Sequence, residues 1–176
     1  MANREALREL QSRLAARLQS SQDQSRTANW LAVESAGQGF LLGLAHAGEI
    51  FPLSALKAVP HTHSWFVGVA NLRGGLHGVV DLAAFLGLRP PTLPESVREH
   101  ARLVALNPSL GAQCALLVER LAGLRLPDQL ERLPDQDDSQ RPAFAGPVWS
   151  DADGRLWQEL DLAALARHEQ FLGIAA

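Results

Sequence analysis

From Trp30 onward the chain consists of short apolar runs, broken roughly every eight to twelve residues by glycine, proline or polar clusters. Runs of this length and spacing predict small β-strands of a sandwich or barrel. The predicted strands lie near residues 30–34, 40–45, 48–52, 66–70, 76–80, 101–106, 113–119, 122–126, 145–150 and 155–160. This part of the chain is therefore predicted to be all-β.

The first 27 residues have a different pattern. Leucines recur there at steps of three and four residues, which predicts an amphipathic helix over residues 4–19: Leu7, Leu10, Leu14 and Leu18. The polar residues 20–27 are predicted to form a linker. The apolar stripe suits either packing on the chain's own domain or docking on a partner helix.

Two pairs of segments resemble one another at nearly the same offset. Residues 66–68 (Phe-Val-Gly) resemble 144–146 (Phe-Ala-Gly), and 81–86 resemble 161–166, where each segment begins Asp-Leu-Ala-Ala. An internal duplication explains both pairs and predicts two similar small β-barrels, roughly residues 28–90 with the C-terminal segment and 98–165, each followed by a short helix. Halves of this size fold marginally alone, so they should bury apolar surface against each other. The groove between them is the predicted binding site.

Residues 65–87, WFVGVANLRGGLHGVVDLAAFLG, combine strand, turn and helix signals in one short stretch. Asn71, Arg73 and Gly74 predict a tight turn between two strands, with polar groups facing outward. Asp81 is placed to cap a short helix that Gly87 ends. The segment is predicted to present a surface.

The run Gly68-Val69-Ala70-Asn71-Leu72-Arg73-Gly74, followed by Asp81-Leu82 and Phe85-Leu86-Gly87, resembles the signature of CheW-like coupling domains. Gly48-Glu49-Ile50 fits the same family, and the resemblance spans roughly residues 38–176. It implies two packed five-stranded SH3-like barrels that bridge a chemoreceptor and a CheA-like histidine kinase, without a cofactor. Residues 65–71 and 166–172 most resemble the branch of the family that serves type IV pilus (twitching) systems.

The resemblance implies two sets of contact residues. Val69, Asn71, Arg73 and Gly74 are expected to touch the receptor's helical hairpin tip, and Glu49 and Ile50 the kinase regulatory domain. A purely structural alternative is that Asn71 closes its own turn and Arg73 pairs with a carboxylate such as Asp81. The family usually has a proline where this chain has Gly78, which leaves that strand less rigid.

Composition narrows the possible partners. Sixteen basic and 19 acidic residues give a formal charge of -3, which provides no electrostatic footprint for nucleic acid or an anionic membrane. Apolar runs such as 41–47 are far shorter than the ~20 residues of a membrane helix. The N-terminus lacks the order of a secretory signal, so the expected location is the cytoplasm, at membrane-associated receptor arrays.

The sequence contains only incomplete motifs for metal binding or catalysis. Asp151-Ala152-Asp153-Gly154 has the start of a calcium loop but not its later ligands, and predicts a hairpin turn instead. His61 and His63 have no carboxylate or cysteine at ligand spacing, so surface histidines are expected, and Cys114 is expected to be a core residue. Residues 127–141 are predicted to form an acidic loop. Four apolar residues are predicted to lie in the core of the second barrel: Val148, Trp149, Leu156 and Trp157.

Two alternatives to the pilus-type adaptor remain open. One is a CheW-like adaptor of a flagellar chemotaxis pathway. The other is a small hydrolase with its site between the barrels, although neither a phosphate-binding loop nor a nucleophile elbow is present in the sequence. A hydrolase predicts a deep pocket with ionisable groups of shifted pKa, whereas an adaptor predicts an open apolar groove with a polar rim.

Overall fold

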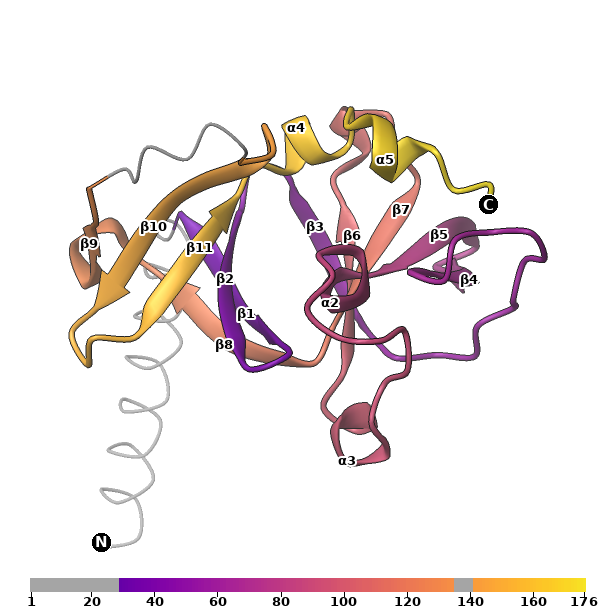
Figure 1. Ribbon diagram of the computed structural model, residues 1–176, viewed down its shortest axis with the longest axis horizontal. Coiled ribbons are helices and arrows are strands. Elements are labelled where there is room, and N and C mark those ends of the chain that lie inside the picture. The colour runs from indigo at the N-terminus through magenta and orange to yellow at the C-terminus, as the bar shows by residue number, and fades with distance from the viewer. Residues whose placement is uncertain (1–28, 135–140) are drawn as a thin grey trace, which may run out of the picture.

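The computed structural model describes residues 29–134 and 141–176, which form two packed β-sheets with short connecting helices (Figure 1). The predicted helix over residues 4–19 and linker 20–27 lie outside the described residues. Barrel 1 has the strand order β3-β6-β7-β5-β4: β3 Ala47–Pro52, β4 Phe66–Leu72, β5 Gly75–Asp81, β6 Arg102–Leu106 and β7 Cys114–Val118. Barrel 2 has the order β8-β1-β2-β11-β10-β9: β1 Trp30–Ser35, β2 Gln38–Gly43, β8 Arg120–Arg125, β9 Leu130–Arg132, β10 Ala145–Asp151 and β11 Leu156–Leu160. The all-β prediction is confirmed.

Both sheets close on themselves by the same device. In barrel 1, the chain beyond β3 returns to β4, where Lys57 and Val69 exchange two backbone hydrogen bonds of 2.9 Å. In barrel 2, the chain beyond β8 passes through the 3-10 turn η2, Pro127–Gln129, and returns as β9 to pair with β10. Strand β9 lies where the sequence predicted an acidic loop, and that prediction was wrong for residues 130–132, which pair because β10 offers them an open edge.

The sheets do not follow the predicted division of the chain at residues 28–90 and 98–165. Strands β1 and β2 belong to barrel 2, and β6 and β7 to barrel 1. The reason lies in two parallel pairings, β5 with β7 and β2 with β11, which occupy the free edges of β7 and β2. The chain therefore passes from barrel 2 to barrel 1 after the β1–β2 hairpin, and returns to barrel 2 after the β6–β7 hairpin. Barrel 1 combines the β6–β7 hairpin with three strands from the other part of the chain, and barrel 2 combines the β1–β2 hairpin with four.

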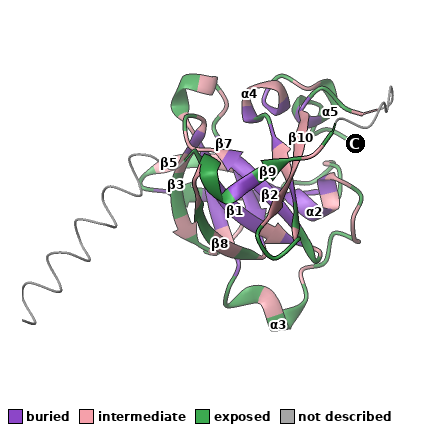
Figure 2. Cartoon of the chain, turned by 90° about the vertical axis from the view of Figure 1, so that its left-hand side faces the viewer, coloured by how far each residue is buried: buried purple, intermediate pink, exposed green. Residues whose placement is uncertain are grey.

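Apolar residues fill the space between the barrels as well as each interior. The largest core cluster contains residues of both barrels, among them Leu42 and Leu160 from barrel 2, and Val104 and Leu116 from barrel 1. Smaller clusters fill barrel 1 around Leu103 and barrel 2 around Trp157. The prediction that the halves bury apolar surface against each other is confirmed, and Figure 2 shows the buried strands at the centre of the molecule.

Four short helices and a further 3-10 turn complete the fold: α2 Leu82–Phe85, α3 Glu95–Arg98, α4 Leu162–Leu165, α5 Glu169–Leu172 and η1 Pro108–Leu110. Asp81 caps α2 by accepting a hydrogen bond from the Ala84 N–H at 3.2 Å, as predicted. Asp161 caps α4 in the same way. Gly87, with φ 69°, follows α2 in the left-handed region that glycine tolerates best.

Candidate functional site

The predicted corner between β4 and β5 is a two-residue hairpin turn at one end of barrel 1. Arg73 and Gly74 have φ of 49° and 83°, the conformation of a type I′ turn. Leu72 pairs with Gly75 across it. The Asn71 side-chain oxygen accepts the Gly74 N–H at 2.8 Å. Asn71 thus closes its own turn, and its amide NH2 is the part of the side chain left to meet a partner.

The Arg73 side chain stands out from this turn and meets β3. Its Nη1 lies 2.9 Å from Glu49 Oε1, and the two side chains are 76% and 53% exposed. The structural alternative, in which Asn71 closes its own turn and Arg73 pairs with a carboxylate, is confirmed in both parts. The carboxylate is Glu49 and not the suggested Asp81, which is buried and pairs with Arg89. A residue expected to touch the receptor and one expected to touch the kinase are therefore in direct contact. An ion pair this exposed contributes at most about 1 kcal/mol to stability.

The ion pair borders a depression of about 340 Å³ at this end of barrel 1. Its lining is largely apolar, with Phe51, Leu72 and Leu106 among the residues, and His77 forms part of its wall. Arg73 and Glu49 supply charge to the rim, so the arrangement suits an aliphatic side chain flanked by polar groups. Binding of a partner's side chain in this depression requires no catalytic residues.

The remaining predicted contact residues do not line this depression. Ile50 is 41% exposed on β3, while Val69 is half-buried in β4 and packs against the core between the barrels. Gly74 sits at the tip of the turn. The structure therefore brings Glu49 and Arg73 together, holds Asn71 beside them, and leaves Val69 farther along the strand.

The glycine at position 78, where the family resemblance led us to expect proline, fits its surroundings in the structure. Its N–H donates to the Gln113 carbonyl at 3.0 Å, a bond that proline cannot form. A Cβ at this position would lie 2.9 Å from Cε2 of Phe66. The Phe66 ring therefore occupies the space that a side chain would need.

The Asp151–Gly154 segment is a hairpin turn, as predicted, at the end of barrel 2. Asp151 Oδ1 accepts the N–H groups of Asp153 and Arg155, and its Oδ2 accepts the Trp157 indole N–H at 2.9 Å. The Trp157 hydrogen bond in particular holds the pKa of Asp151 below its ordinary value. Within residues 29–134 and 141–176 there is no group of three histidine, cysteine or acidic side chains that could hold a metal ion.

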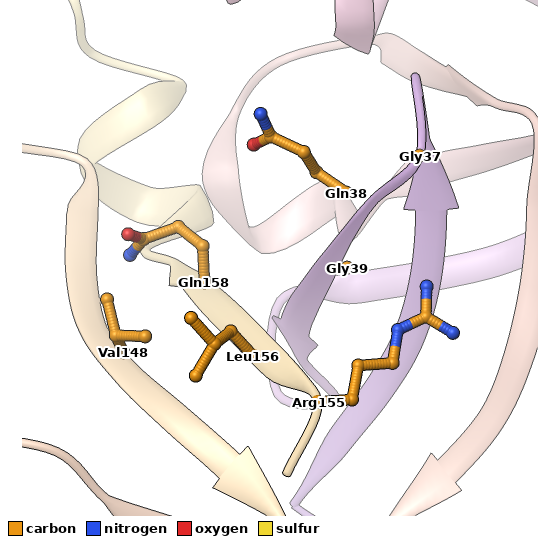
Figure 3. Close-up of a pocket in the computed structure, with 7 residues that line it drawn as sticks. All are labelled: Gly37, Gln38, Gly39, Val148, Arg155, Leu156 and Gln158. Atoms are coloured by element: carbon orange, nitrogen blue, oxygen red, sulfur yellow. The ribbon is translucent and has the colours of Figure 1, made fainter.

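The four residues predicted for the core of barrel 2 divide into two groups. Trp157 is 1% exposed, and Trp149 packs partly buried against the same cluster. Leu156 is 56% exposed, so its assignment to the core was wrong. Alternation explains the difference, because neighbouring residues of β11 point to opposite faces and Trp157 takes the inner one. Val148 lies with Leu156 along the edge of a surface depression (Figure 3).

Two buried ionic groups had no sequence signal of their own. Arg89 lies 2.9 Å from Asp81 and 2.8 Å from Glu119, and it also donates to the Pro90 and Thr92 carbonyls. It therefore ties the cap of α2 to the single residue that separates β7 from β8. The comparison of Asp81 with Asp161 could have drawn attention to the first aspartate, but not to its partner Arg89 or to Glu119, which Arg89 also contacts.

Glu34 forms the second ionic cluster, in barrel 2. Burial alone would raise its pKa, but hydrogen bonds and charges from Arg120 and Arg155 outweigh burial and hold the pKa below its ordinary value. Cys114 is buried, as predicted, and burial raises the pKa of its thiol to about 12. That thiol stays protonated at neutral pH and is a poor nucleophile. Among the described residues no helix is long and apolar enough to cross a membrane.

The chain belongs to the CheW-like domain family, whose model matches residues 29–170. It is thus a scaffold-type protein of bacterial chemosensory systems. It is 26% identical to Protein PilI of Pseudomonas aeruginosa over 166 residues, covering 93% of this chain and 89% of that protein.

Two further relatives support the family assignment. The chain is 35% identical to a probable chemotaxis protein CheW of Rhizobium etli over 75 residues, covering 43% of this chain and 46% of the relative. The crystal structure of the scaffolding protein TtCheW from Thermoanaerobacter tengcongensis superposes with a TM-score of 0.61 at 18% identity, over 77% of this chain and 89% of that one. This likeness confirms the paired-barrel fold.

Proposed function

We propose that this chain is a non-enzymatic adaptor that couples a chemoreceptor to a CheA-like histidine kinase in the chemosensory array of a type IV pilus system. The observation that carries the proposal is the barrel 1 end, where Arg73 and Glu49 form an exposed ion pair beside an apolar depression. Adaptor surfaces of this kind combine an apolar contact area with a polar rim. The proposed location is the cytoplasm, at arrays of membrane-bound receptors.

Arg73 is the residue best suited to the receptor contact. The left-handed turn pushes its side chain out of the sheet, and Asn71 and Gly74 hold the turn closed from within. A guanidinium can donate several hydrogen bonds while its stem covers apolar surface. Glu49 and Ile50, on the neighbouring strand, form the proposed kinase contact.

Binding measurements on purified protein test the proposal. Wild type is expected to bind a receptor signalling-tip fragment and, separately, the kinase regulatory domain. Arg73→Glu is expected to lose the receptor fragment while keeping its melting temperature. Arg98→Glu, which reverses another exposed, ion-paired arginine, on α3, is the matched control and should bind like wild type. Wild type that binds neither partner would contradict the proposal.

A flagellar adaptor is the second candidate, supported by the similarity to the Rhizobium etli protein over part of the chain. The similarity to PilI covers nearly the whole chain, which favours the pilus system. Tip fragments from a pilus-type and a flagellar-type receptor, offered in competition, separate the two. Preference for the flagellar fragment would overturn the pilus assignment and leave the adaptor function intact.

A further inference from the structure

The described chain ends against barrel 1, although its last strand belongs to barrel 2. After β11 it continues through α4 and α5, and Figure 1 shows this C-terminal segment crossing one side of the molecule toward barrel 1. Ala175 pairs there with Thr62, which lies between β3 and β4. Residues 174–176 are called the C-terminal strap below, and residues 57–64 the strapped loop. The strap thus fastens the chain that leaves barrel 2 to a loop of barrel 1.

Two backbone hydrogen bonds flank this pair. His63 N–H donates to the Ile174 carbonyl at 2.9 Å, and Ala176 N–H donates to the His61 carbonyl at 3.1 Å. All three strap residues are exposed, whereas α5 before them is anchored by the buried Phe171. A short exposed segment held by two backbone bonds opens at a small fraction of the free energy of global unfolding. The strap can therefore release while α5 stays packed.

The strapped loop is strained at one of its points of attachment. His61 has a φ of 58°, in the left-handed region that residues with a Cβ seldom adopt. Such a conformation persists only where the surrounding structure fixes it. The His61 carbonyl is the acceptor of one of the two strap bonds. Release of the strap removes that constraint, so the backbone at His61 can then relax.

The strapped loop also packs on β4, the strand that leads into the turn of the proposed receptor contact. Lys57, the first residue of the loop, is bonded to Val69 through both of its backbone groups. The approach is so close that a Cβ on Gly68 would collide with the Lys57 carbonyl oxygen. At the other end of the loop the His63 ring stacks on Trp65, with ring centroids 5.5 Å apart. Displacement of the loop would therefore disturb both the edge of β4 and this stack.

We propose that the C-terminal strap is releasable and that, when it is paired, it keeps the strapped loop seated on β4. In the paired state the Lys57–Val69 bonds hold the edge of β4, and the turn at Arg73 has one fixed position. In the released state this edge fluctuates, and a receptor that binds the turn must also order it, which lowers the affinity. The strap itself requires no receptor, whereas its effect on receptor affinity rests on the proposed function.

Fluorine NMR of the full chain labelled with 5-fluorotryptophan reports the position of the loop, because Trp65 stacks on His63. Trp65→Phe assigns the signal among the four tryptophans. Ala176→Pro removes the N–H that bonds to His61 and is expected to shift or broaden the Trp65 signal alone. Ala175→Pro is the matched control, because the Ala175 N–H points away from the loop in this antiparallel pairing. A Trp65 signal that is unchanged in Ala176→Pro, or equally changed in both variants, would overturn the proposal.

A disulfide across the pair provides the converse test. Thr62 and Ala175 form a non-hydrogen-bonded antiparallel pair, and the Cα separation of such pairs, about 4.5 Å, suits a disulfide. The oxidised variant Thr62→Cys/Ala175→Cys locks the strap, and the same protein after reduction is its control. Locking is expected to slow amide hydrogen exchange in the strapped loop several-fold, because the released state is no longer accessible. Equal exchange in the two forms would contradict a releasable strap.

Calorimetric titration with the receptor signalling-tip fragment, and separately with the kinase regulatory domain, tests the effect on binding. A chain without residues 174–176 is expected to bind the receptor fragment about tenfold more weakly than wild type, and the locked double variant at least as tightly. Affinity for the kinase domain should not change, because Glu49 and Ile50 lie on β3, which pairs with β6. The melting temperature should also stay at the wild-type value, since α5 remains anchored.

The outcomes separate the strap from the adaptor function. Equal affinity for the receptor fragment with and without the strap would overturn the effect on binding. A wild type that binds no receptor fragment would contradict the proposed function together with this effect. The Trp65 signal and the exchange rates decide independently whether the strap seats the loop.

Discussion

Five strands follow the same order in the two barrels, yet the barrels secure the helix that follows their hairpin differently. In barrel 1, the capping residue Asp81 is 1% exposed and pairs with Arg89, which in turn contacts Glu119. In barrel 2, the equivalent Asp161 is exposed, and its side chain accepts hydrogen bonds from the backbone N–H groups of Ala163 and Ala164. Asp81 therefore belongs to a largely buried ionic cluster that reaches the residue between β7 and β8, whereas Asp161 is an ordinary helix cap at the surface. The two helices share the same capping motif, and the surroundings of each aspartate determine how much it contributes to stability.

The largest expected loss of stability comes from disrupting the ionic cluster of Asp81, Arg89 and Glu119. Asp81→Ala removes the α2 cap and one of the two carboxylate partners of a nearly buried guanidinium, and breaking a buried ion pair costs about 3–5 kcal/mol. Asp161→Ala removes a helix cap, which costs about 1 kcal/mol. Urea denaturation measures both free energies of unfolding. Equal losses at the two positions would show that the Arg89 contacts do not distinguish the barrels.

Arg89 itself offers a sharper version of this comparison. Arg89→Lys keeps the charge but cannot reach Asp81, Glu119 and two carbonyls at once, so it should lose about 2 kcal/mol of stability. The double variant Asp81→Ala/Arg89→Ala should lose less than the sum of the single variants, since the Asp81–Arg89 interaction is lost in each single variant and counted twice in the sum. Additive losses would contradict a coupled pair.

Gly78 in barrel 1 should tolerate a side chain less well than a glycine of barrel 2. A Cβ there meets the Phe66 ring at 2.9 Å, so Gly78→Ala is expected to cost about 1–3 kcal/mol. Gly43 at the end of β2 has nothing within 4 Å of its virtual Cβ, and Gly43→Ala should be neutral or slightly stabilising. Thermal melts monitored by circular dichroism provide the measurement. A stable Gly78→Ala protein would show that Phe66 can move aside.

Low pH should destabilise barrel 2 by protonating Glu34 and Asp151. Both carboxyls have a pKa lower in the folded chain than in the unfolded one, so their stabilising effect is complete above the ordinary carboxyl range. It is lost as pH falls through about 4 toward the folded values, because the unfolded state then binds more protons. Stability of wild type measured against pH should fall over this range. The variant Glu34→Gln/Asp151→Asn should be less stable at neutral pH and show a flatter acid limb.

The smallest effect on stability should come from the exposed pair at the barrel 1 end. Arg73→Glu places two carboxylates side by side, yet both positions are mostly solvated, so the loss should stay within about 1 kcal/mol. Differential scanning calorimetry, compared with Arg98→Glu, measures it. A large fall in melting temperature would mean that Arg73 serves the architecture rather than a partner.

The sequence carried enough local information to predict most strands, the Asn71–Gly74 turn and both caps. Glycine and aspartate at fixed positions specify turns and helix starts through short-range hydrogen bonds. It could not predict which strands share a barrel, because the pairings of β2 with β11 and β5 with β7 join residues far apart along the chain. Strand β9 was missed for a similar reason, since three mostly exposed residues have no alternation to read and pair only because β10 is there.

At the candidate site, the sequence motifs and the family resemblance indicated Arg73 and Glu49 as contact residues, but for two different partners. Their contact at 2.9 Å depends on how β3 lies beside the β4–β5 turn, because Arg73 comes 24 residues after Glu49 in the sequence. Leu156 was assigned to the core because an apolar residue beside two tryptophans usually lies inside. Only the register of β11 shows that its side chain faces outward.

The most direct test of the adaptor account is whether one molecule can hold both partners at once, because the proposed receptor and kinase contacts meet at Arg73 and Glu49. Wild-type protein, a receptor signalling-tip fragment and the kinase regulatory domain should be mixed and separated by size-exclusion chromatography with light scattering. The account predicts a ternary complex that contains all three components. Displacement of the kinase domain by the receptor fragment, or the absence of either binary complex, would contradict it.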